Sequence, residues 1–232
     1  MRWKNKKAFF LILLLYFFCA RLIVMKVLLG TTNPSKVDRF SHLLAGYDIE
    51  FLTLNDIGNP KEPEEKGETP EENARIKALF YSAFADSVIC SDSGLYFKEL
   101  DMADPRQPGL KIRTPMGRKR LKDEEMIEYY SSLINSLGGK VTAYYVDGIA
   151  VCHKGKVTSF MNIDSAQETG SFFMIDKPSS ERFPGWPLDS LSINIETGKY
   201  FVDVKRNDSK ENIIKDKYKV YMLEYLKEAL EL

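Results

Sequence analysis

Apolar residues recur at two spacings in the first part of the chain, and these spacings predict alternating strands and helices. A compact apolar run predicts a strand over residues 26–30, and helical spacing of apolar positions predicts a helix over 36–45. Gly46 is placed to end that helix, and a second strand is expected over 49–54. The pattern is therefore typical of a β-α-β unit.

The next segment combines a loop with a clear helix start. Residues 55–68 carry prolines, glycines and charges without periodicity, which is typical of a loop. Thr69 is suited to cap a helix, Pro70 favours its first position, and Glu72 completes the spacing of a capping box. The predicted helix runs to about residue 85.

A short buried strand is predicted after this helix, over residues 88–91. Asp92 then follows at the carboxyl end of the strand, which is where open α/β sheets place their ligands. We therefore expect chemistry at Asp92.

The second half of the chain predicts a long loop, two helices and a hairpin. The expected elements are a basic, solvated loop over 101–122, a helix over 123–137, antiparallel strands over 141–152 and 156–163, a loop-rich stretch over 164–191, and a final amphipathic helix over 216–232. The predicted fold class is α/β: a mixed sheet flanked by helices, with an added antiparallel arm and a cleft.

The N-terminus has the layout of a signal peptide or a short membrane anchor, because basic residues precede an apolar run over 8–18. This run is too short to span a bilayer, which takes about 20 apolar residues, and Arg21 interrupts its extension. Three explanations stay open for residues 1–24: an extension upstream of a start at Met25, an anchor, or a cleaved signal. We expect a single domain over 25–232, and membrane association only through 1–24.

Composition excludes some partners. Lys plus Arg and Asp plus Glu both number 33, so no overall field attracts nucleic acid, and an anion site must be local. The three cysteines are an odd number without paired spacing, which favours a reducing compartment over a disulfide framework.

The junction of the first strand and helix is suited to bind phosphate. Thr31, Asn33 and Lys36 put a hydroxyl, an amide and an ammonium group at a helix N-terminus, where backbone N–H groups favour anions. Ordinary helix capping by Asn33 or Ser35 is the alternative explanation.

Three segments together carry a resemblance. Thr-x-Asn-x-x-Lys over 31–36 is followed by Glu-x-Gly-x-Thr with Glu-Asn-Ala and Lys-Ala over 65–78, and then by Ser-Asp-Ser-Gly-Leu over 91–95. Their order and content resemble the inosine triphosphate pyrophosphatase family. The resemblance implies an elongated α/β fold with a twisted mixed sheet, two lobes around a nucleotide cleft, and commonly a homodimer. It also implies Mg²⁺-dependent hydrolysis of ITP, XTP and dITP to the monophosphate and pyrophosphate, in the cytoplasm.

The resemblance also implies roles for particular residues. Matching positions give a metal site of Glu65 and Asp92, catalytic roles for Asp92 and Lys77, and phosphate contacts from Thr31, Asn33, Lys36 and Lys77. The chain departs from the family at Ser91, where the family has the first of two adjacent acids. Glu68, Glu71 and Glu72 are candidates to replace the missing charge, and a helix start also accounts for the last two.

The base-binding part of the family pattern is altered in this chain. Phe183, Trp186 and Asp189 keep the order of aromatic and acidic residues, with changed spacing, and an aromatic residue in such a loop also serves simply to fill space. A later segment keeps Lys210 and offers Lys215, but lacks the family's Ser-His-Arg. The hypothesis is therefore a pyrophosphatase, with a weak nucleotide-binding protein or an enzyme of different base preference as alternatives. A membrane-associated protein of other function is a further alternative, which rests only on residues 1–24.

Overall fold

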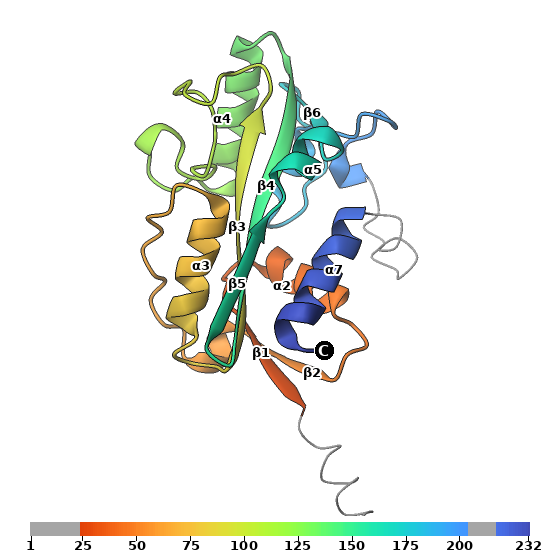
Figure 1. Cartoon of the computed structure of the whole chain (residues 1–232). Helices are drawn as coiled ribbons and strands as arrows, with labels where there is room; N and C mark the ends of the chain where they lie inside the picture. The colour runs from red at the N-terminus through yellow and green to blue at the C-terminus, as the bar shows by residue number, and fades with distance from the viewer. Residues whose placement is uncertain (1–23, 204–216) are drawn as a thin grey trace, which may run out of the picture.

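The computed structural model describes residues 24–203 and 217–232, which form one mixed sheet with helices on both faces (Figure 1). The strand order is β2-β1-β3-β4-β6-β7, and β5 pairs with β4 beside this path. The strands are β1 (Met25–Leu29), β2 (Ile49–Leu52), β3 (Ser87–Phe97), β4 (Lys140–His153), β5 (Lys156–Met161), β6 (Phe172–Ile175) and β7 (Ser192–Ile193). The helices are α2 (Pro34–Leu43), α3 (Pro70–Tyr81), α4 (Asp123–Ser136), α5 (Ile163–Glu168) and α7 (Lys217–Leu230), with 3₁₀ turns at Leu54–Ile57, Pro115–Gly117, Pro187–Ser190 and Phe201–Asp203.

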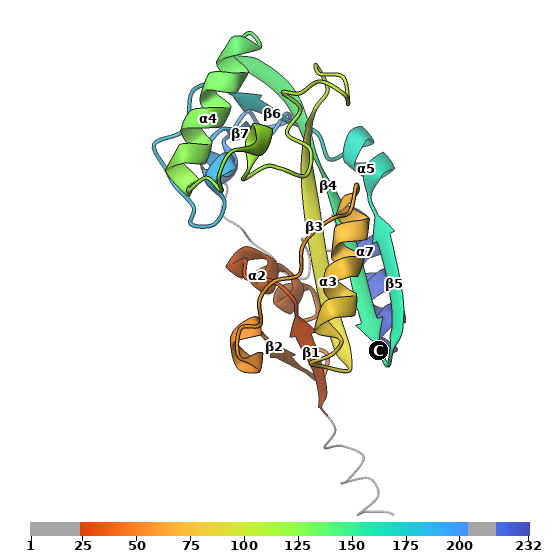
Figure 2. The same ribbon diagram turned by 90° about the vertical axis from the view of Figure 1, so that its left-hand side faces the viewer.

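The predicted fold class is confirmed. Strand β1 pairs in parallel with β2 and β3, as expected for a β-α-β start, and β3, β4, β5 and β6 pair antiparallel. The long strands β3 and β4 run side by side through the molecule, with α4 at one end and β1 and β2 at the other (Figures 1 and 2).

One edge of β3 is open at its centre. Strand β1 pairs with β3 only as far as Ile89, and the next neighbour on that edge is Gly109, which bridges to Leu95. The backbone of β3 between these two points therefore faces a gap in the sheet.

The prediction that this strand ends at Ser91, just before Asp92, is wrong. The strand continues to Phe97 because β4 is equally long and pairs with it from Ser87↔His153 to Phe97↔Ala143. Asp92 thus lies in the middle of a strand, although still beyond the carboxyl end of β1. A long partner strand supplies hydrogen bonds that local sequence does not reveal.

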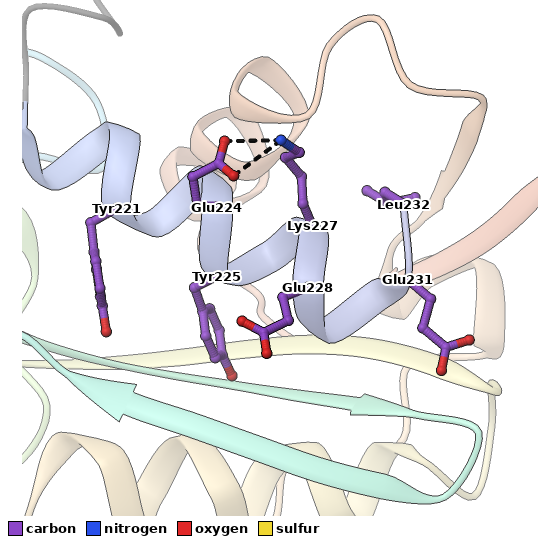
Figure 3. Close-up of a pocket in the computed structure, with 7 residues that line it drawn as sticks. All are labelled: Tyr221, Glu224, Tyr225, Lys227, Glu228, Glu231 and Leu232. Atoms are coloured by element: carbon purple, nitrogen blue, oxygen red, sulfur yellow. Dashed lines mark hydrogen bonds and ion pairs between the residues drawn. The ribbon is translucent and has the colours of Figure 1, made fainter.

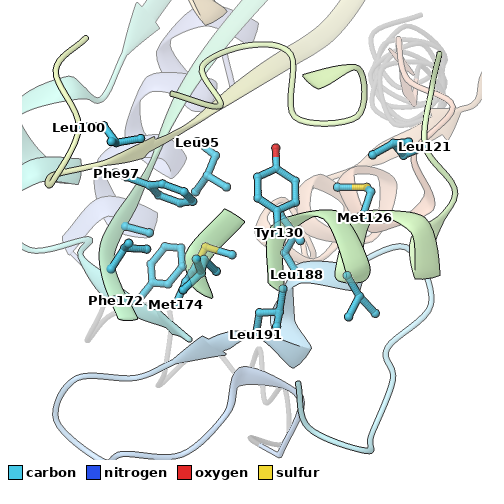
Figure 4. Close-up of a cluster of buried hydrophobic side chains, with 14 residues drawn as sticks. Leu95, Phe97, Leu100, Leu121, Met126, Tyr130, Phe172, Met174, Leu188 and Leu191 are labelled. Atoms are coloured by element: carbon cyan, nitrogen blue, oxygen red, sulfur yellow. The ribbon is translucent and has the colours of Figure 1, made fainter. Parts of the chain in front are cut away.

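The buried side chains form separate clusters on the two faces and at the α4 end. One cluster packs α3 against the sheet around Leu28, Ala78 and Tyr81. Another packs α2 and α7 against the opposite face. The α4 cluster, drawn in Figure 4, includes Leu95, Phe97, Leu100, Leu121, Met126, Tyr130, Phe172, Met174, Leu188 and Leu191.

The start of α3 follows the prediction only in part. Thr69 Oγ1 accepts a hydrogen bond from Glu72 N at 3.1 Å, as a capping residue should. The Glu72 carboxylate, however, accepts from Glu68 N at 2.6 Å and leaves the reciprocal bond of a capping box unmade. The helix also ends at Tyr81, before the predicted residue 85.

Other predictions are corrected or lie outside the described residues. The stretch 164–191, expected to be loop-rich, contains most of α5 and the whole of β6; these elements are too short to give a clear periodic signal. Nearly all of the N-terminal extension, and the segment with Lys210 and Lys215, lie outside the described residues. None of the helices in the described ranges has the length and apolar character needed to cross a bilayer.

Gly148 of β4 lets α3 approach the sheet closely. A Cβ atom at this position would lie 2.2 Å from both Glu71 N and Pro70 C, which are backbone atoms at the start of α3. We expect Gly148→Ala to reduce the free energy of unfolding by about 1–3 kcal/mol, because the helix must shift. Gly155→Ala, in the open turn between β4 and β5 at φ +78°, should cost about 1 kcal/mol through backbone strain alone. Urea unfolding of both variants checks this, and equal losses would contradict it.

Candidate functional site

A cavity of about 450 Å³ opens beside the exposed edge of β3. It lies between the start of α2, the polar face of α3 and loops of the α4 end. Six residues predicted from the sequence line it together: Thr31, Asn33, Lys36, Glu65, Lys77 and Asp92. Segments far apart in the sequence therefore meet at one site.

The start of α2 is shaped by hydrogen bonds between its own residues. Asn33 Oδ1 accepts from Ser35 N at 2.9 Å, and Thr31 Oγ1 accepts from Asn33 N at 3.1 Å. The capping explanation for Asn33 is therefore correct, and both side chains also face the cavity. Capping and ligand contact are compatible because each oxygen retains a free lone pair.

Lys36 crosses from α2 to the open edge of β3. Its Nζ donates to the Ser91 carbonyl oxygen at 3.1 Å, using a backbone acceptor that β1 leaves unpaired. Burial lowers the pKa of Lys36 to about 8, and the positive charge of Lys77 acts in the same direction. The free cavity thus holds a lysine whose pKa is about 8, below its ordinary value of 10.5.

Lys77 lies between two carboxylates. Its Nζ is 2.9 Å from Glu65 Oε1 and 3.5 Å from Asp92 Oδ1. Burial acts to lower the pKa of Lys77, but the charges of Asp92 and Glu65 outweigh it, and the net direction is upward. Asn73 holds the other side of Asp92, since its Nδ2 donates to Asp92 Oδ2 at 3.0 Å.

The carboxylates of Glu65 and Asp92 suit a magnesium ion chemically. No group of three or more His, Cys, Asp or Glu side chains with metal-binding geometry occurs in the described ranges. Magnesium, however, is commonly held by one or two carboxylates together with substrate phosphates and water. Both acids lie within 3.5 Å of the same ammonium group, that of Lys77.

The side chains of Ser91 and Asp92 lie on opposite faces of β3. Side chains alternate along β3, so Ser91 points to the opposite face of the sheet, where it is buried and its hydroxyl has no hydrogen-bond partner among described residues. The position at which the family has the first of its two acids therefore faces away from the Asp92 carboxylate in this chain.

The acids proposed to compensate for the missing charge lie at or just before the start of α3, where two of them accept hydrogen bonds within the protein. Glu71 Oε1 accepts from Ser159 Oγ at 2.6 Å, and Glu72 accepts from Glu68 N. None of Glu68, Glu71 and Glu72 is among the residues that line the cavity.

The far end of the cavity is formed by the loop before the 3₁₀ turn Pro187–Ser190 and by that turn itself. Trp186 and Asp189 line it, whereas Phe183 is 43% exposed and does not. A Cβ at Gly185 would be 3.0 Å from Ser35 Oγ, so this loop approaches the start of α2. Lys210 and Lys215, the other predicted base-binding residues, lie outside the described residues.

The sequence pattern of the Ham1 family matches residues 27–164, more than half of the chain. The chain belongs to the Ham1 family. This confirms the resemblance to the inosine triphosphate pyrophosphatase family, and the matched region carries all six residues above. The loop with Trp186 and Asp189 lies beyond it.

Individual relatives agree with this membership. A dITP/XTP pyrophosphatase of Thermoanaerobacter sp. (strain X514) is 32% identical over 135 residues, covering 58% of this chain and 66% of that protein, just under two thirds. One from Oceanobacillus iheyensis is 30% identical over 137 residues, covering 58% of this chain and 68% of the relative. The structure of a HAM1 protein from Coxiella burnetii has a TM-score of 0.66 at 20% identity, covers 88% of this chain and 100% of that chain, and supports the fold.

Sequence reasoning missed an ion pair in this Ham1-family cavity. Arg39 Nη1 is 2.9 Å from Asp147 Oδ2, and both residues line the cavity. Ser93 and Tyr218 also donate to the Asp147 carboxylate, at 2.6 and 3.3 Å. An acid within the apolar run of β4, and an arginine one turn after Lys36, were the available signals.

A second hollow, of about 460 Å³, lies along α7 and holds none of the predicted residues. Figure 3 shows Tyr221 and Tyr225 pointing toward the sheet, where both contact the Phe160 ring, while Glu224 and Lys227 form an ion pair on the outer side. Its polar groups do not converge on a common point, in contrast to the first cavity.

Removing the charge of Asp147 should destabilise the protein. Burial acts to raise the pKa of Asp147, but Arg39 and Ser93 outweigh it and hold the pKa below its ordinary value of 3.8. We expect Asp147→Asn to cost about 3–5 kcal/mol at pH 7, because the Arg39 charge loses its partner. Since the folded pKa is depressed, this stabilisation is complete above about pH 4 and is lost as pH falls through the folded pKa.

Urea unfolding at pH 7 and at progressively lower pH measures this difference. Asp38→Asn, on the exposed side of α2, is the control and should change stability by less than about 0.5 kcal/mol. A loss for Asp147→Asn that stays constant down to pH 3 would contradict the electrostatic explanation.

Proposed function

We propose that this protein hydrolyses non-standard purine nucleoside triphosphates, namely ITP, XTP and dITP, to the monophosphate and pyrophosphate. The observation that carries the proposal is the arrangement of Lys36, Lys77, Glu65 and Asp92 around one cavity at the open edge of β3. Cations neutralise the charge of a triphosphate, and a carboxylate orients or activates the attacking water. The names of the relatives support the same activity.

The phosphates are bound at the start of α2. Lys36 and Lys77 neutralise phosphate oxygens, and Lys77 exchanges part of its contact with Glu65 and Asp92 for the ligand. The Thr31 hydroxyl and Asn33 amide donate further hydrogen bonds, next to the positive end of the helix. These contacts orient the triphosphate so that the bond between the α-phosphorus and the bridging oxygen faces Asp92.

Asp92 activates the attacking water. Its carboxylate takes a proton as the water oxygen bonds to the α-phosphorus, the bond from that phosphorus to the bridging oxygen breaks, and pyrophosphate leaves with the electron pair. Asn73 fixes the carboxylate by donating to Oδ2, which leaves Oδ1 for the proton. Lys77 stabilises the charge that develops on the phosphate oxygens.

Glu65 and Asp92 are the residues that would hold magnesium. Bound there, the ion would supply additional charge neutralisation for the triphosphate. A site of only two carboxylates depends on substrate oxygens to complete the coordination, so metal and nucleotide should bind cooperatively.

The base belongs at the far end of the cavity. Trp186 offers a stacking surface, and Asp189 accepts hydrogen bonds from ring N–H groups. Lys210 and Lys215 are proposed as further base contacts on the resemblance alone. We also infer that residues 25–232 are the functional unit, that it forms a homodimer, and that it works in the cytoplasm, where its substrates occur.

The proposal is tested by pyrophosphate release from the full chain with magnesium and a panel of triphosphates. ITP, XTP and dITP should be hydrolysed in preference to the four standard nucleotides and modified pyrimidine triphosphates. Asp92→Asn should lower kcat by about 10²–10⁴-fold, because it removes the general base. Asp86→Asn, which changes an exposed acid just before the same strand, should match the wild type.

The outcomes separate the alternatives. Selectivity for another base, abolished in Asp92→Asn, would keep the mechanism and change the substrate. Release from no nucleotide above the level of that variant would refute the enzyme and leave a nucleotide-binding protein.

Lys36 should give the activity an alkaline limit. Because the pKa of Lys36 is about 8 in the free cavity, the side chain is a cation below that pH and neutral above it. We expect kcat/KM, which reports groups of the free enzyme, to fall up to about tenfold per pH unit above pH 8.

Arginine keeps its proton over this range, so Lys36→Arg should retain activity without the fall between pH 8 and 10. Lys36→Met should be impaired already at pH 7. The same alkaline limb in Lys36→Arg would assign the titration to another group.

A further inference from the structure

Tyr145 occupies the far end of the cavity in a fixed orientation. It lies on β4, two residues before Asp147, and its ring stacks on Phe172 of β6 with centroids 5.5 Å apart and an interplanar angle of 21°. The apolar side chains of Leu110, Ile112, Met126 and Leu188 line the same end. These apolar groups suit a flat ring, and Arg113 lines the cavity beside them.

The Tyr145 hydroxyl has no internal partner. It makes no hydrogen bond within the part of the chain that the structure describes, although the residue lines the cavity. A phenol without a hydrogen-bond partner is costly once water is displaced, by about 1–3 kcal/mol. A ligand that fills this end should therefore supply a hydrogen-bonding atom.

The charges around Tyr145 indicate which kind of ligand atom pairs with its hydroxyl. Burial raises the pKa of Tyr145, as do the nearby carboxylates of Asp189 and Asp147, whereas Arg113 acts in the opposite direction. The phenol thus stays protonated at neutral pH and serves as a donor. Arg39 already neutralises Asp147, and the Asp189 carboxylate disfavours an anionic phosphate oxygen, so a neutral carbonyl oxygen is the fitting acceptor.

We propose that Tyr145 determines specificity in the proposed reaction by donating a hydrogen bond from its hydroxyl to a ring carbonyl oxygen of the purine base. This deepens the proposed function and rests on it. The phosphates bind at Lys36 and Lys77, so the base of the same ligand reaches the end where Tyr145, Trp186 and Asp189 meet. Tyr145 contributes the donor, while Trp186 provides the stacking surface.

The test removes the two partners of the proposed hydrogen bond, the Tyr145 hydroxyl and the base oxygen, one at a time. Tyr145→Phe deletes the hydroxyl and keeps the ring on Phe172, and purine riboside triphosphate lacks the base oxygen of ITP. We expect Tyr145→Phe to lower kcat/KM for ITP about 5- to 10-fold, while activity on purine riboside triphosphate changes by less than about twofold. An equal loss on both substrates, or no loss, would overturn the proposal.

Tyr144→Phe is the matched control. Tyr144 is the adjacent residue on the opposite face of β4, where its ring stacks on Tyr96 at 5.6 Å and its hydroxyl accepts from Gln167 Nε2 at 3.2 Å. The same loss of one oxygen there should leave kcat/KM for both nucleotides within about twofold of the wild type.

Binding by calorimetry separates this inference from the proposed function. IMP and purine riboside monophosphate are titrated into the wild type and both variants, so no hydrolysis is needed. If the wild type hydrolyses no triphosphate but Tyr145→Phe weakens IMP selectively, the pyrophosphatase is refuted and the base contact stands. If neither monophosphate binds the wild type, the base contact is refuted as well.

Discussion

The candidate site depends on the length difference between neighbouring strands. Strands β3 and β4 form a continuous antiparallel ladder, whereas β1 stops beside Ile89. The backbone of β3 beyond that point keeps one unpaired edge, and unpaired edges must find other partners. Here Lys36 donates to the Ser91 carbonyl oxygen, and Gly109 pairs with Leu95 farther along the strand. The cavity lies in the space between these two contacts.

Around this gap the two ends of the cavity have opposite character. The end near α2 and α3 is charged, with Lys36 and Lys77 balanced by Glu65 and Asp92. The other end combines apolar side chains of the α4 cluster with Tyr145, Asp189 and Arg113. This division matches a ligand with a highly charged tail and a flat neutral head, and it explains why one cavity needs side chains from both halves of the chain.

Local sequence signals predicted local structure well. The Thr69 cap, the end of α4 at Gly138, and the turn at residues 154–155 all depend on nearby residues, and the structure contains each. The position of Asp92 within a strand was not predictable, because it depends on a distant partner strand. The opposite orientation of Ser91 follows from that same extension, since alternation applies only within a strand.

The residues of the candidate site also divide into those that local sequence motifs predicted and those that depend on distant packing. The three family motifs identified six of the residues that line the cavity, and the altered base-binding segment identified Trp186 and Asp189. Tyr145 and the Arg39–Asp147 pair lie in regular elements without a local motif, and only their packing across the sheet brings them together. Such residues require the three-dimensional arrangement.

The β3–β4 ladder also has a consequence for the route by which the chain folds. The two strands are separated in sequence by the long basic loop and the whole of α4, so their pairing closes a large loop of chain. Loop-closure entropy opposes this step until many pairs have formed, and proteins dominated by such distant pairings fold slowly. We therefore expect the cavity to form together with this ladder, and the β-α-β unit and the β4–β5 hairpin, whose contacts are closer in sequence, to form earlier.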